Sequence, residues 1–574
     1  MTSLLRFARR YLVAYLPWYA AGTLLLAATN LLSVTIPLYL ADGIDAIAAG
    51  SGRERLLWDA ALVAVMGLGV IVVRTGSRLL FFTPGRLVEA QVKHDLFDRL
   101  MRRQPSFHDQ YPTGDLVSRA TSDVNTVRLL AGFTSLGVIN TVVAAVTVGT
   151  QMVRISPTLA GAVAIPLIIG FGITLLFVNR LFVVMRRLQA ETAALSDHVL
   201  SSFQGMATMQ AFRAEPAFID RFDHHNDAWV STTLERARLR ITIGPVLTLA
   251  TSFNVFLLLW VGGPMASRGE ITVGELVAFT TLVAYLSGPL RGLSFIVSLF
   301  RQAEASLERI DAVMVPALDR PDLPDPTPAP PDPPSITLDA LTFRYPGSDD
   351  LALDSVSLEI PPGTTLGVIG STGSGKTTLA RCIARLVNPP PGTVKIDGID
   401  VLDLDLDAWR RRLAYVPQRA FLFTESVRDN ILLGEEDPDL LDRVLDLAAL
   451  RTDLESLPDG VATEVGEGGL TLSGGQRQRV ALARGLARDP SILVLDDVLS
   501  AVDHSTEHEL VSAIRRQTRR PTTIIVANRV SALQHAETIA VLEGGRLVDI
   551  GTHEQLIARP GLYHDTWARQ SETE

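Results

Sequence analysis

Long uncharged apolar runs in the first half of the chain constrain its fold more than any other feature. Residues 11–40, 129–153, 155–179 and 241–267 contain no acidic or basic side chain, and residues 276–300 contain only Arg291. A helix needs about 20 mostly apolar residues to cross a bilayer. Each of these five runs is therefore predicted to form a membrane span.

A sixth span is predicted between residues 59 and 82, where the pattern is weaker. Only 14 uncharged residues separate Asp59 from Arg74, so this span must also include Arg74 and Arg78. Charged side chains at membrane depth are costly unless they face protein or water, or extend to the interface. Arg74, Arg78 and Arg291 therefore either line a water-filled cavity or reach the inner interface or a helix carbonyl, and the sequence leaves both interpretations open.

The segments between the spans predict the orientation of the chain. Arg6, Arg9 and Arg10 precede the first span, and positive charge favours the cytoplasmic side. Residues 83–128 and 180–240 are long and rich in arginine, so we expect helices that continue from the spans into the cytoplasm. The first apolar run is too long for the core of a signal peptide. These features predict a multi-pass protein of the cell inner (cytoplasmic) membrane, with the N-terminus and the second half of the chain in the cytoplasm.

Composition divides the chain at a proline-rich segment. Residues 1–315 carry 27 Lys and Arg against 22 Asp and Glu, whereas residues 316–574 carry 25 against 40. Nine prolines lie within residues 316–334, and proline favours an extended linker. We therefore predict an all-α membrane domain of six helices at 1–315, a linker at 316–334 and a soluble α/β domain at 335–574. No basic stripe of the kind that binds nucleic acid stands out, and the single cysteine, Cys382, excludes an internal disulfide.

The soluble half contains a phosphate-binding loop. A predicted strand at 366–369 leads into Gly370-Ser-Thr-Gly-Ser-Gly-Lys-Thr-Thr378, which matches the pattern GxxxxGK[ST]. A helix predicted at 379–386 aims its N-terminus at the bound anion. Lysine is rare in this chain, and Lys376 is placed to reach the β- and γ-phosphates, while the Thr377 hydroxyl can bind Mg²⁺. The loop residues expected to bind ATP are Gly370, Ser371, Thr372, Gly373, Ser374, Gly375, Lys376, Thr377 and Thr378.

A second phosphate-site element is the apolar strand predicted at 492–497, which ends in Asp496 and Asp497. A buried strand that places a carboxylate at its C-terminal end suits Mg²⁺. Asp496 is therefore the candidate on the metal side. Further strands are predicted at 336–338 and 353–360, before the loop.

Taken in order, these motifs resemble those of the ATP-binding cassette (ABC) transporter family. The sequence Thr471-Leu-Ser-Gly-Gly-Gln476 is similar to the family's signature, and residues 463–467 resemble the segment that precedes it in exporters. Ser473 would also serve as the N-cap of a helix that begins near Gly474. The other elements are Tyr345, which resembles the aromatic residue that stacks on adenine, Gln418, which resembles the Q-loop glutamine, and Asp503, which resembles the D-loop aspartate.

The resemblance covers essentially the whole chain, because six spans followed by one cassette is the half-transporter layout of ABC exporters. It implies ATP hydrolysis coupled to transport, with ATP and Mg²⁺ as ligands and with Thr377, Gln418 and Asp496 around the metal. It also implies that the signature residues of one cassette contact the ATP on the loop of another. These residues are Leu472, Ser473, Gly474, Gly475 and Gln476.

Movement of the cassettes would reach the spans through short coupling helices, which are expected at 107–116 and 204–214. The cargo is expected to be hydrophobic or amphipathic, such as a drug, lipid or peptide, because the spans contain aromatic residues and few charges. The same aromatic residues could instead face lipid. They are Phe253, Phe256, Trp260, Phe295 and Phe300.

Two departures from the family pattern bear on catalysis. Asp497 stands where the family has the glutamate that polarises the attacking water, and Asn528 stands where it has a histidine. Aspartate is shorter, and asparagine cannot become a cation. We expect the chain's own site to bind ATP but hydrolyse it poorly, and its signature to complete a competent site on a different partner subunit. The alternatives are a slow homodimer in which Asp497 suffices, and an ATP-gated or regulatory ABC membrane protein.

Overall fold

The computed structural model describes residues 2–50, 53–316, 327–328, 333–434, 437–466, 469, 472–498, 510, 512, 514 and 520–571. They divide into two compact units. Met1–Met101 with Pro112–Pro316 form what we call the helical unit, and Arg102–Tyr111 with Ala317–Glu574 form the sheet unit. Residues 102–111, which the sequence assigned to the membrane domain, thus group with the sheet unit.

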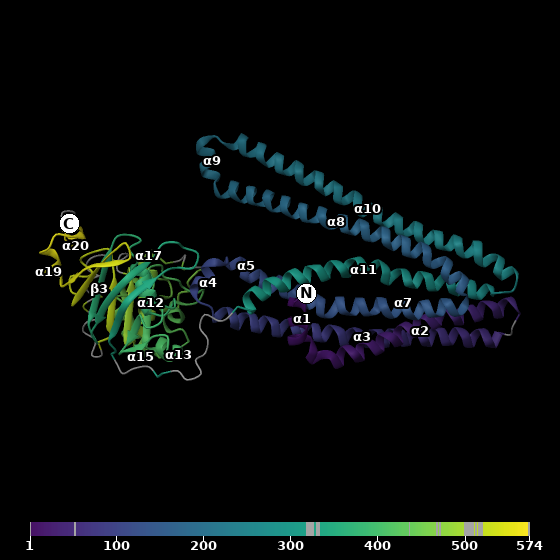
Figure 1. Cartoon of the computed structure of the whole chain (residues 1–574), viewed down its shortest axis with the longest axis horizontal. Helices are drawn as coiled ribbons and strands as arrows, with labels where there is room; N and C mark the ends of the chain where they lie inside the picture. Colours follow the sequence, from purple (N-terminus) through teal and green to yellow (C-terminus); the bar gives the residue numbers. More distant parts are fainter. Residues whose placement is uncertain are drawn as a thin grey trace. The chain divides into compact units, whose positions relative to one another are not determined.

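Six long helical stretches make up the described part of the helical unit (Figure 1). Two of them are interrupted by short π or 3-10 turns, and the other four are single helices. The first comprises α1 (Thr2–Phe7), η1 (Ala8–Leu12), η2 (Val13–Tyr15) and α2 (Leu16–Ala48), and the second is α3 (Arg53–Met101). The third comprises α5 (Thr113–Ser118), η3 (Arg119–Asp123), α6 (Val124–Leu129), η4 (Leu130–Thr134) and α7 (Ser135–Ile155). The remaining three are α8 (Pro157–Gln204), α10 (Glu215–Ser267) and α11 (Val273–Met314).

The predicted spans lie within these stretches, with one correction. The fourth span was expected from residue 155, but α8 begins at Pro157. The Ser156 side chain caps the new helix by accepting a hydrogen bond from the Leu159 N–H, and proline is favoured at the first helical position. The weakest span by sequence lies in α3, an unbroken helix of 49 residues in which Arg74 and Arg78 are exposed.

Apolar length distinguishes the stretches. Among the described residues, Ser3–Ala48, Glu54–Met101 and Thr113–Ile155 are long and apolar enough to cross a membrane by length and composition. Pro157–Gly170, Ser252–Ser267 and Val273–Leu286 are shorter apolar helical segments.

Short helices occupy both segments where coupling helices were expected. α4 (Pro105–Gln110) precedes α5, and α9 (Met206–Phe212) joins α8 to α10. The three elements α8, α9 and α10 form a long hairpin with α9 at its tip (Figure 1). Near the other end of this hairpin, buried apolar side chains of α2, α7, α8, α10 and α11 form one cluster. Its members include Val34, Val148, Leu159, Leu258 and Phe279.

Two sheets form the framework of the sheet unit. The strands β2 (Leu353–Ile360), β1 (Ile336–Phe343), β4 (Val394–Ile396) and β5 (Ile399–Asp400) make an antiparallel sheet in that order. The second sheet has the order β10 (Arg546–Gly551), β9 (Thr538–Glu543), β3 (Thr365–Gly370), β8 (Thr522–Val526), β7 (Ile492–Asp496) and β6 (Leu413–Val416). Its strands are parallel except for the edge strand β10.

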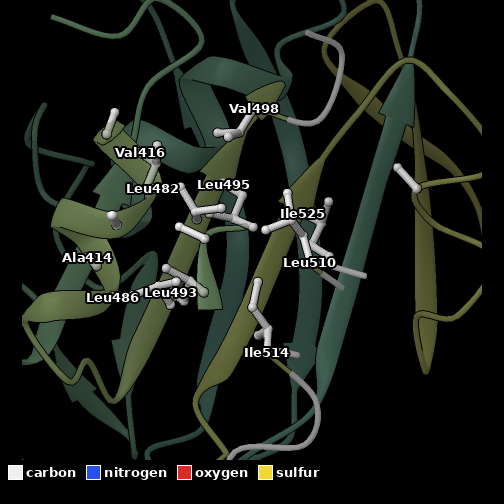
Figure 2. Close-up of a cluster of buried hydrophobic side chains, with 14 of the residues drawn as sticks. Ala414, Val416, Leu482, Leu486, Leu493, Leu495, Val498, Leu510, Ile514 and Ile525 are labelled. Atoms are coloured by element: carbon white, nitrogen blue, oxygen red, sulfur yellow. The ribbon is translucent and has the colours of Figure 1, made fainter. Parts of the chain in front are cut away.

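Helices cover the parallel sheet and bury its central strands. Besides α4, the helices in the described part of the unit are α12 (Lys376–Ile383), α13 (Leu406–Arg412), α14 (Val427–Leu432), α15 (Pro438–Leu447), α16 (Arg451–Glu455), α17 (Gly474–Ala487), α19 (His553–Ile557) and α20 (Leu562–Ser571), with the 3-10 turn η5 (Gly460–Ala462). Figure 2 shows Leu482 and Leu486 of α17 against Leu493 and Leu495 of β7. Every residue of β7 and β8 is buried. Because β3, β8, β7 and β6 run parallel, their carboxyl ends lie at one edge of the sheet.

Candidate nucleotide site

The phosphate-binding loop follows β3 and turns directly into α12. A Cβ atom on Gly370 would lie 2.2 Å from the Leu542 carbonyl oxygen, and one on Gly375 would lie 2.4 Å from the Ala352 carbonyl oxygen. Gly375 also has a φ of +96°, which side chains rarely adopt. Helix α12 begins at Lys376, so the predicted start at residue 379 was wrong. The sequence motif thus forms the tight strand–loop–helix turn that its glycines predicted.

Two side chains of the loop fit an anionic ligand. Ser374 is buried, and among the described residues its Oγ atom has no hydrogen-bond partner. Lys376 donates from Nζ to the carbonyl oxygens of Gly370 and Ser371, at 2.8 and 2.9 Å. Burial lowers the pKa of Lys376, although Asp497 and Asp496 oppose this shift. A buried polar atom without a partner is unusual, and a phosphate accepting hydrogen bonds here would give the Ser374 hydroxyl a partner and offer Lys376 an anionic acceptor.

Asp496 lies at the C-terminal end of β7 and contacts the loop. Its Oδ1 atom accepts a hydrogen bond from Thr377 Oγ1 at 3.0 Å, and its Oδ2 atom accepts one from the Tyr415 hydroxyl at 2.8 Å. Burial raises the pKa of Tyr415 above its usual range, so this hydroxyl stays protonated and donates. No group of three or more His, Cys, Asp or Glu side chains that could hold a metal lies among the described residues. A Mg²⁺ ion beside Thr377 and Asp496 would therefore depend on phosphate oxygens and water for further ligands.

Asp497 is the first residue after β7, where the backbone turns. Its φ is +53°, and its N–H donates to the Val526 carbonyl oxygen at 2.9 Å. Its Oδ2 atom accepts hydrogen bonds from Gln418 Nε2 at 2.9 Å and from Asn528 Nδ2 at 3.2 Å. Burial raises the pKa of Asp497, as does the neighbouring Asp496, while Gln418 and Lys376 oppose the rise. The two residues that depart from the family pattern are thus in direct contact.

Gln418 joins this cluster to the helix that follows the signature. It lies just beyond β6, and its carbonyl oxygen accepts a hydrogen bond from Gln478 Nε2 of α17 at 3.1 Å. Its side chain donates to Asp497, so its expected role as a Mg²⁺ ligand stays a prediction. Sequence reasoning missed both Gln478 and Tyr415. Strand order, which a single sequence does not contain, places Tyr415 of β6 beside β7.

The signature residues form the N-terminus of α17. Ser473 Oγ accepts a hydrogen bond from the Gln476 N–H at 3.2 Å, and the Ser473 N–H donates to Gln476 Oε1 at 2.9 Å. Ser473 is therefore the N-cap that the sequence suggested, in a capping box. Leu472 is buried, whereas Ser473 and Gly474 are exposed and Gly475 is partly exposed. The end of the helix that carries a partial positive charge is thus accessible.

Of the remaining predicted site residues, the structure describes some and leaves others outside the described residues. Tyr345 follows β1, with its hydroxyl 3.4 Å from Thr378 Oγ1 and its ring 5.1 Å from that of Phe343. This places it beside the start of α12. Ser371, Thr372 and Gly373 are exposed on the loop. Asp503 lies outside the described residues, as do Thr471 and Glu467, and the side chain of Arg291 is not described.

Comparison with known proteins covers both units. A model of the ABC transporter transmembrane region matches residues 19–290, and a model of the ABC transporter matches residues 353–500. The chain is similar to the probable multidrug resistance ABC transporter ATP-binding/permease protein YheI of Bacillus subtilis, with 31% identity over 99% of this chain and 98% of that protein. It is also similar to the ATP-dependent lipid A-core flippase of Desulfotalea psychrophila, with 30% identity over 92% of this chain and 96% of that protein.

A solved structure gives the same result for the fold. The structure of a bacterial Atm1-family ABC exporter with ATP bound matches with a TM-score of 0.81 and 26% sequence identity. The match covers 98% of this chain and 99% of that one.

Proposed function

The chain belongs to the ABC transporter family, and we propose that it is the half of a two-subunit exporter whose own nucleotide site binds ATP but hydrolyses it slowly. Membership makes it a multi-pass membrane protein with an ATP hydrolase coupled to transport. The proposal adds that the two composite sites of the dimer differ, and that this chain's loop belongs to the weaker one.

The observation that carries the proposal is the contact between Asp497 and Asn528. Both amide donors, Gln418 and Asn528, donate to the same carboxylate oxygen of Asp497. The carboxylate is thus held among side chains of its own cassette. A general base must come within hydrogen-bond reach of the water it activates. A base one methylene shorter, and held in this way, reaches that water poorly.

One property of Asp497 favours hydrolysis instead. Burial raises its pKa, which makes its ionised form a better proton acceptor. Position outweighs proton affinity here, because a misplacement of about 1 Å can cost roughly 100-fold in rate. The raised pKa is nevertheless the observation that favours the second candidate, a slow homodimer in which Asp497 suffices.

The exposed signature supports a role in a partner's site. A helix N-terminus with free N–H groups suits a phosphate, and the N-terminus of α17 is accessible at Ser473 and Gly474. Two copies of this chain would make two weak sites. A different subunit that supplies the glutamate and histidine in its own nucleotide site would form a competent site with this signature.

In this proposal ATP lies on the loop from Gly370 to Thr378, with its adenine beside Tyr345. Mg²⁺ bound near Thr377 and Asp496 would neutralise phosphate charge. Lys376 would bind the β- and γ-phosphates, and Gln418 would link the site to α17 through Gln478. Asp503 and Gln418 keep the roles that the family pattern gives them as predictions.

The cargo is proposed to be hydrophobic or amphipathic, such as a drug, lipid or peptide, and the location to be the cell inner membrane. Phe253, Phe256 and Trp260 lie stacked along α10, with ring centroids 5.9 and 5.6 Å apart. Their side chains are 51%, 51% and 69% exposed in the single chain. Such a surface suits contact with cargo, lipid or a partner's spans. Arg74 and Arg78 are exposed in the single chain too, and both interpretations of them, a water-filled cavity or the inner interface and a helix carbonyl, stay predictions.

The test is to purify the chain alone and together with a second half-transporter of the same organism that carries the glutamate and histidine, and to measure ATPase activity in lipid nanodiscs. We expect a stable complex whose activity far exceeds that of this chain alone. Equal activity of the chain alone would contradict the proposal and favour the homodimer. Cargo-stimulated ATPase with uphill uptake into inverted vesicles would distinguish an exporter from an ATP-gated or regulatory membrane protein.

A further inference from the structure

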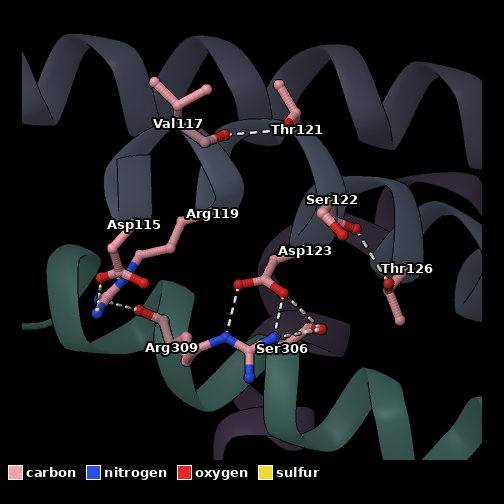
Figure 3. A network of polar contacts seen from close by, with 9 residues as sticks. All are labelled: Asp115, Val117, Arg119, Thr121, Ser122, Asp123, Thr126, Ser306 and Arg309. Atoms are coloured by element: carbon pink, nitrogen blue, oxygen red, sulfur yellow. Dashed lines mark hydrogen bonds and ion pairs between the residues drawn. The ribbon is translucent and has the colours of Figure 1, made fainter. Parts of the chain in front are cut away.

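A buried carboxylate joins two distant segments of the helical unit. Asp123, at the end of the π-helical turn η3, is 2% exposed. It accepts hydrogen bonds from Ser306 Oγ at 2.9 Å and from Arg309 Nε at 2.8 Å, and a further one from Arg309 Nη2 (Figure 3). Ser306 and Arg309 belong to α11. A two-pronged contact between arginine and a carboxylate fixes relative orientation as well as distance.

A second arginine crosses between the same two segments in the opposite direction. Arg119, at the start of η3, is 7% exposed and donates from Nη1 to the backbone oxygen of Arg309 at 2.8 Å. Its Nε atom donates to Asp115 Oδ2 at 3.0 Å, at the beginning of α5. Arg309 is therefore held both by its side chain and by its backbone. We call the four residues Asp115, Arg119, Asp123 and Arg309 the clasp.

Three of the four clasp residues are close in sequence to points where the chain passes from one unit to the other. The chain returns to the helical unit at Pro112 and leaves it at Pro316. Asp115 and Arg119 follow the first point closely, and Arg309 precedes the second. A third passage, after Met101, is tied to the same end of α11, because Arg99 donates to the carbonyl oxygen of Val313 at 3.3 Å and to that of Pro316.

We propose that the clasp makes the segment after α4 and the end of α11 move as one body, so that Asp123 and Arg309 are positioning residues for the coupling of ATP binding to transport. The inference rests on the transporter function but not on the slow hydrolysis at Asp497. A merely stabilising contact is the simpler alternative. The burial of Asp123 and the closeness of the clasp residues to the points where the chain passes between the units favour the coupling role.

The chain is suited to a direct test with spin labels. Ser118 and Ala305 are exposed residues beside the clasp on α5 and α11, and each can be replaced by cysteine. The native Cys382 is buried, and burial raises its pKa to about 12, so labelling is confined to the introduced cysteines. Labelled full-length chain, diluted with unlabelled chain in nanodiscs, gives the distance distribution between the labels with and without Mg-ATP.

Three variants with this labelled pair define the expected results. The native clasp should give a narrow distribution that is unchanged by Mg-ATP. Asp123→Asn should broaden it in both conditions, and Arg309→Lys, which keeps the charge but loses the two-pronged contact, should give an intermediate width. The matched control is Glu308→Gln, an exposed carboxylate next to Arg309, which should leave the distribution narrow.

Activity distinguishes coupling from plain stability. For the transporter in proteoliposomes, whether it assembles from this chain alone or with a second subunit, Asp123→Asn should lower the amount of dye transported per ATP hydrolysed by about tenfold, since a hydrogen bond to a charged group contributes about that factor. A purely structural role would lower both rates in proportion. A native label distance that changes with Mg-ATP, an Asp123→Asn distribution as narrow as that of the control, or an unchanged transport-to-ATPase ratio would each overturn the proposal.

Discussion

Replacing Asp497 by glutamate should accelerate hydrolysis at this chain's own site. Glutamate lengthens the side chain by one carbon–carbon bond, about 1.5 Å. A misplacement of about 1 Å can cost roughly 100-fold in rate, which corresponds to about 2.7 kcal/mol of activation free energy. The longer side chain therefore recovers the reach that Asp497 lacks.

The contacts of Asp497 limit this gain. Its Oδ2 atom accepts two neutral hydrogen bonds, from Gln418 and Asn528, and each contributes about 1 kcal/mol. If both are lost in Asp497→Glu, the rate should rise about threefold, and if both re-form it should rise about 100-fold. Adding Asn528→His should raise the rate further, because histidine can carry a positive charge beside the phosphate.

The assay is phosphate release by the full chain in nanodiscs at saturating Mg-ATP. The KM for ATP should stay constant, because Gly370, Ser374 and Lys376 are unchanged. Asp496→Asn in the same background should abolish the gain. If Asp497→Glu binds ATP normally but hydrolyses it at the native rate, side-chain reach is not what limits this site and the reasoning is refuted.

Three further results follow from the same geometry. Gly370→Ala should abolish binding of a fluorescent ATP analogue, because its Cβ would lie 2.2 Å from a backbone oxygen, whereas Gly474→Ala, with open space around it, should bind normally. Tyr415→Phe removes a donor to Asp496 and should change the Mg²⁺ affinity measured by titration in the presence of ATP by up to about tenfold. Asp497→Asn should raise the melting temperature at neutral pH, because burial raises the pKa of Asp497 and disfavours its ionised form, and this gain should shrink as the pH falls below that pKa and vanish below the ordinary pKa of an aspartate in the unfolded chain.

Each of these results has a contradicting outcome. Normal ATP binding by Gly370→Ala would mean that the loop is not the nucleotide site. If Tyr415→Phe leaves the Mg²⁺ affinity unchanged, Asp496 is not a ligand of the metal. A stabilisation by Asp497→Asn that persists in acid would assign the effect to packing, since the carboxyl and amide are then both neutral.

The sequence predicted those parts of the site in which the chemistry requires a fixed spacing between residues. The glycines, Lys376 and Thr377 must follow one another to enclose a phosphate, and Asp496 must end a buried strand. The start of α12 was misjudged because the apolar pattern begins at Leu379, whereas the helix begins with the polar residue Lys376 after the left-handed Gly375. The apolar pattern of a sequence does not mark the start of a helix when the first turn consists of polar residues that bind a ligand.

Contacts between distant segments escaped prediction for a different reason. Tyr415 reaches Asp496 only because β6 lies beside β7. A single sequence does not reveal the order of strands in a sheet. Asp123 and Arg309 are 186 positions apart, and neither belongs to a motif that the sequence singled out. The long apolar helices were predictable because bilayer thickness sets the length of a span, but which residues bind across the helices depends on packing.

The most direct test of the central claim is the identity of the nucleotide on this chain's loop after turnover. The complex with its partner subunit is incubated with Mg-ATP labelled at the α-phosphate and crosslinked through the adenine, and the nucleotide attached to this chain is then identified. The account predicts that this nucleotide remains ATP while the partner's is converted to ADP, and that Asp497→Asn changes neither result. Conversion to ADP on this chain at the rate of transport, prevented by Asp497→Asn, would contradict it.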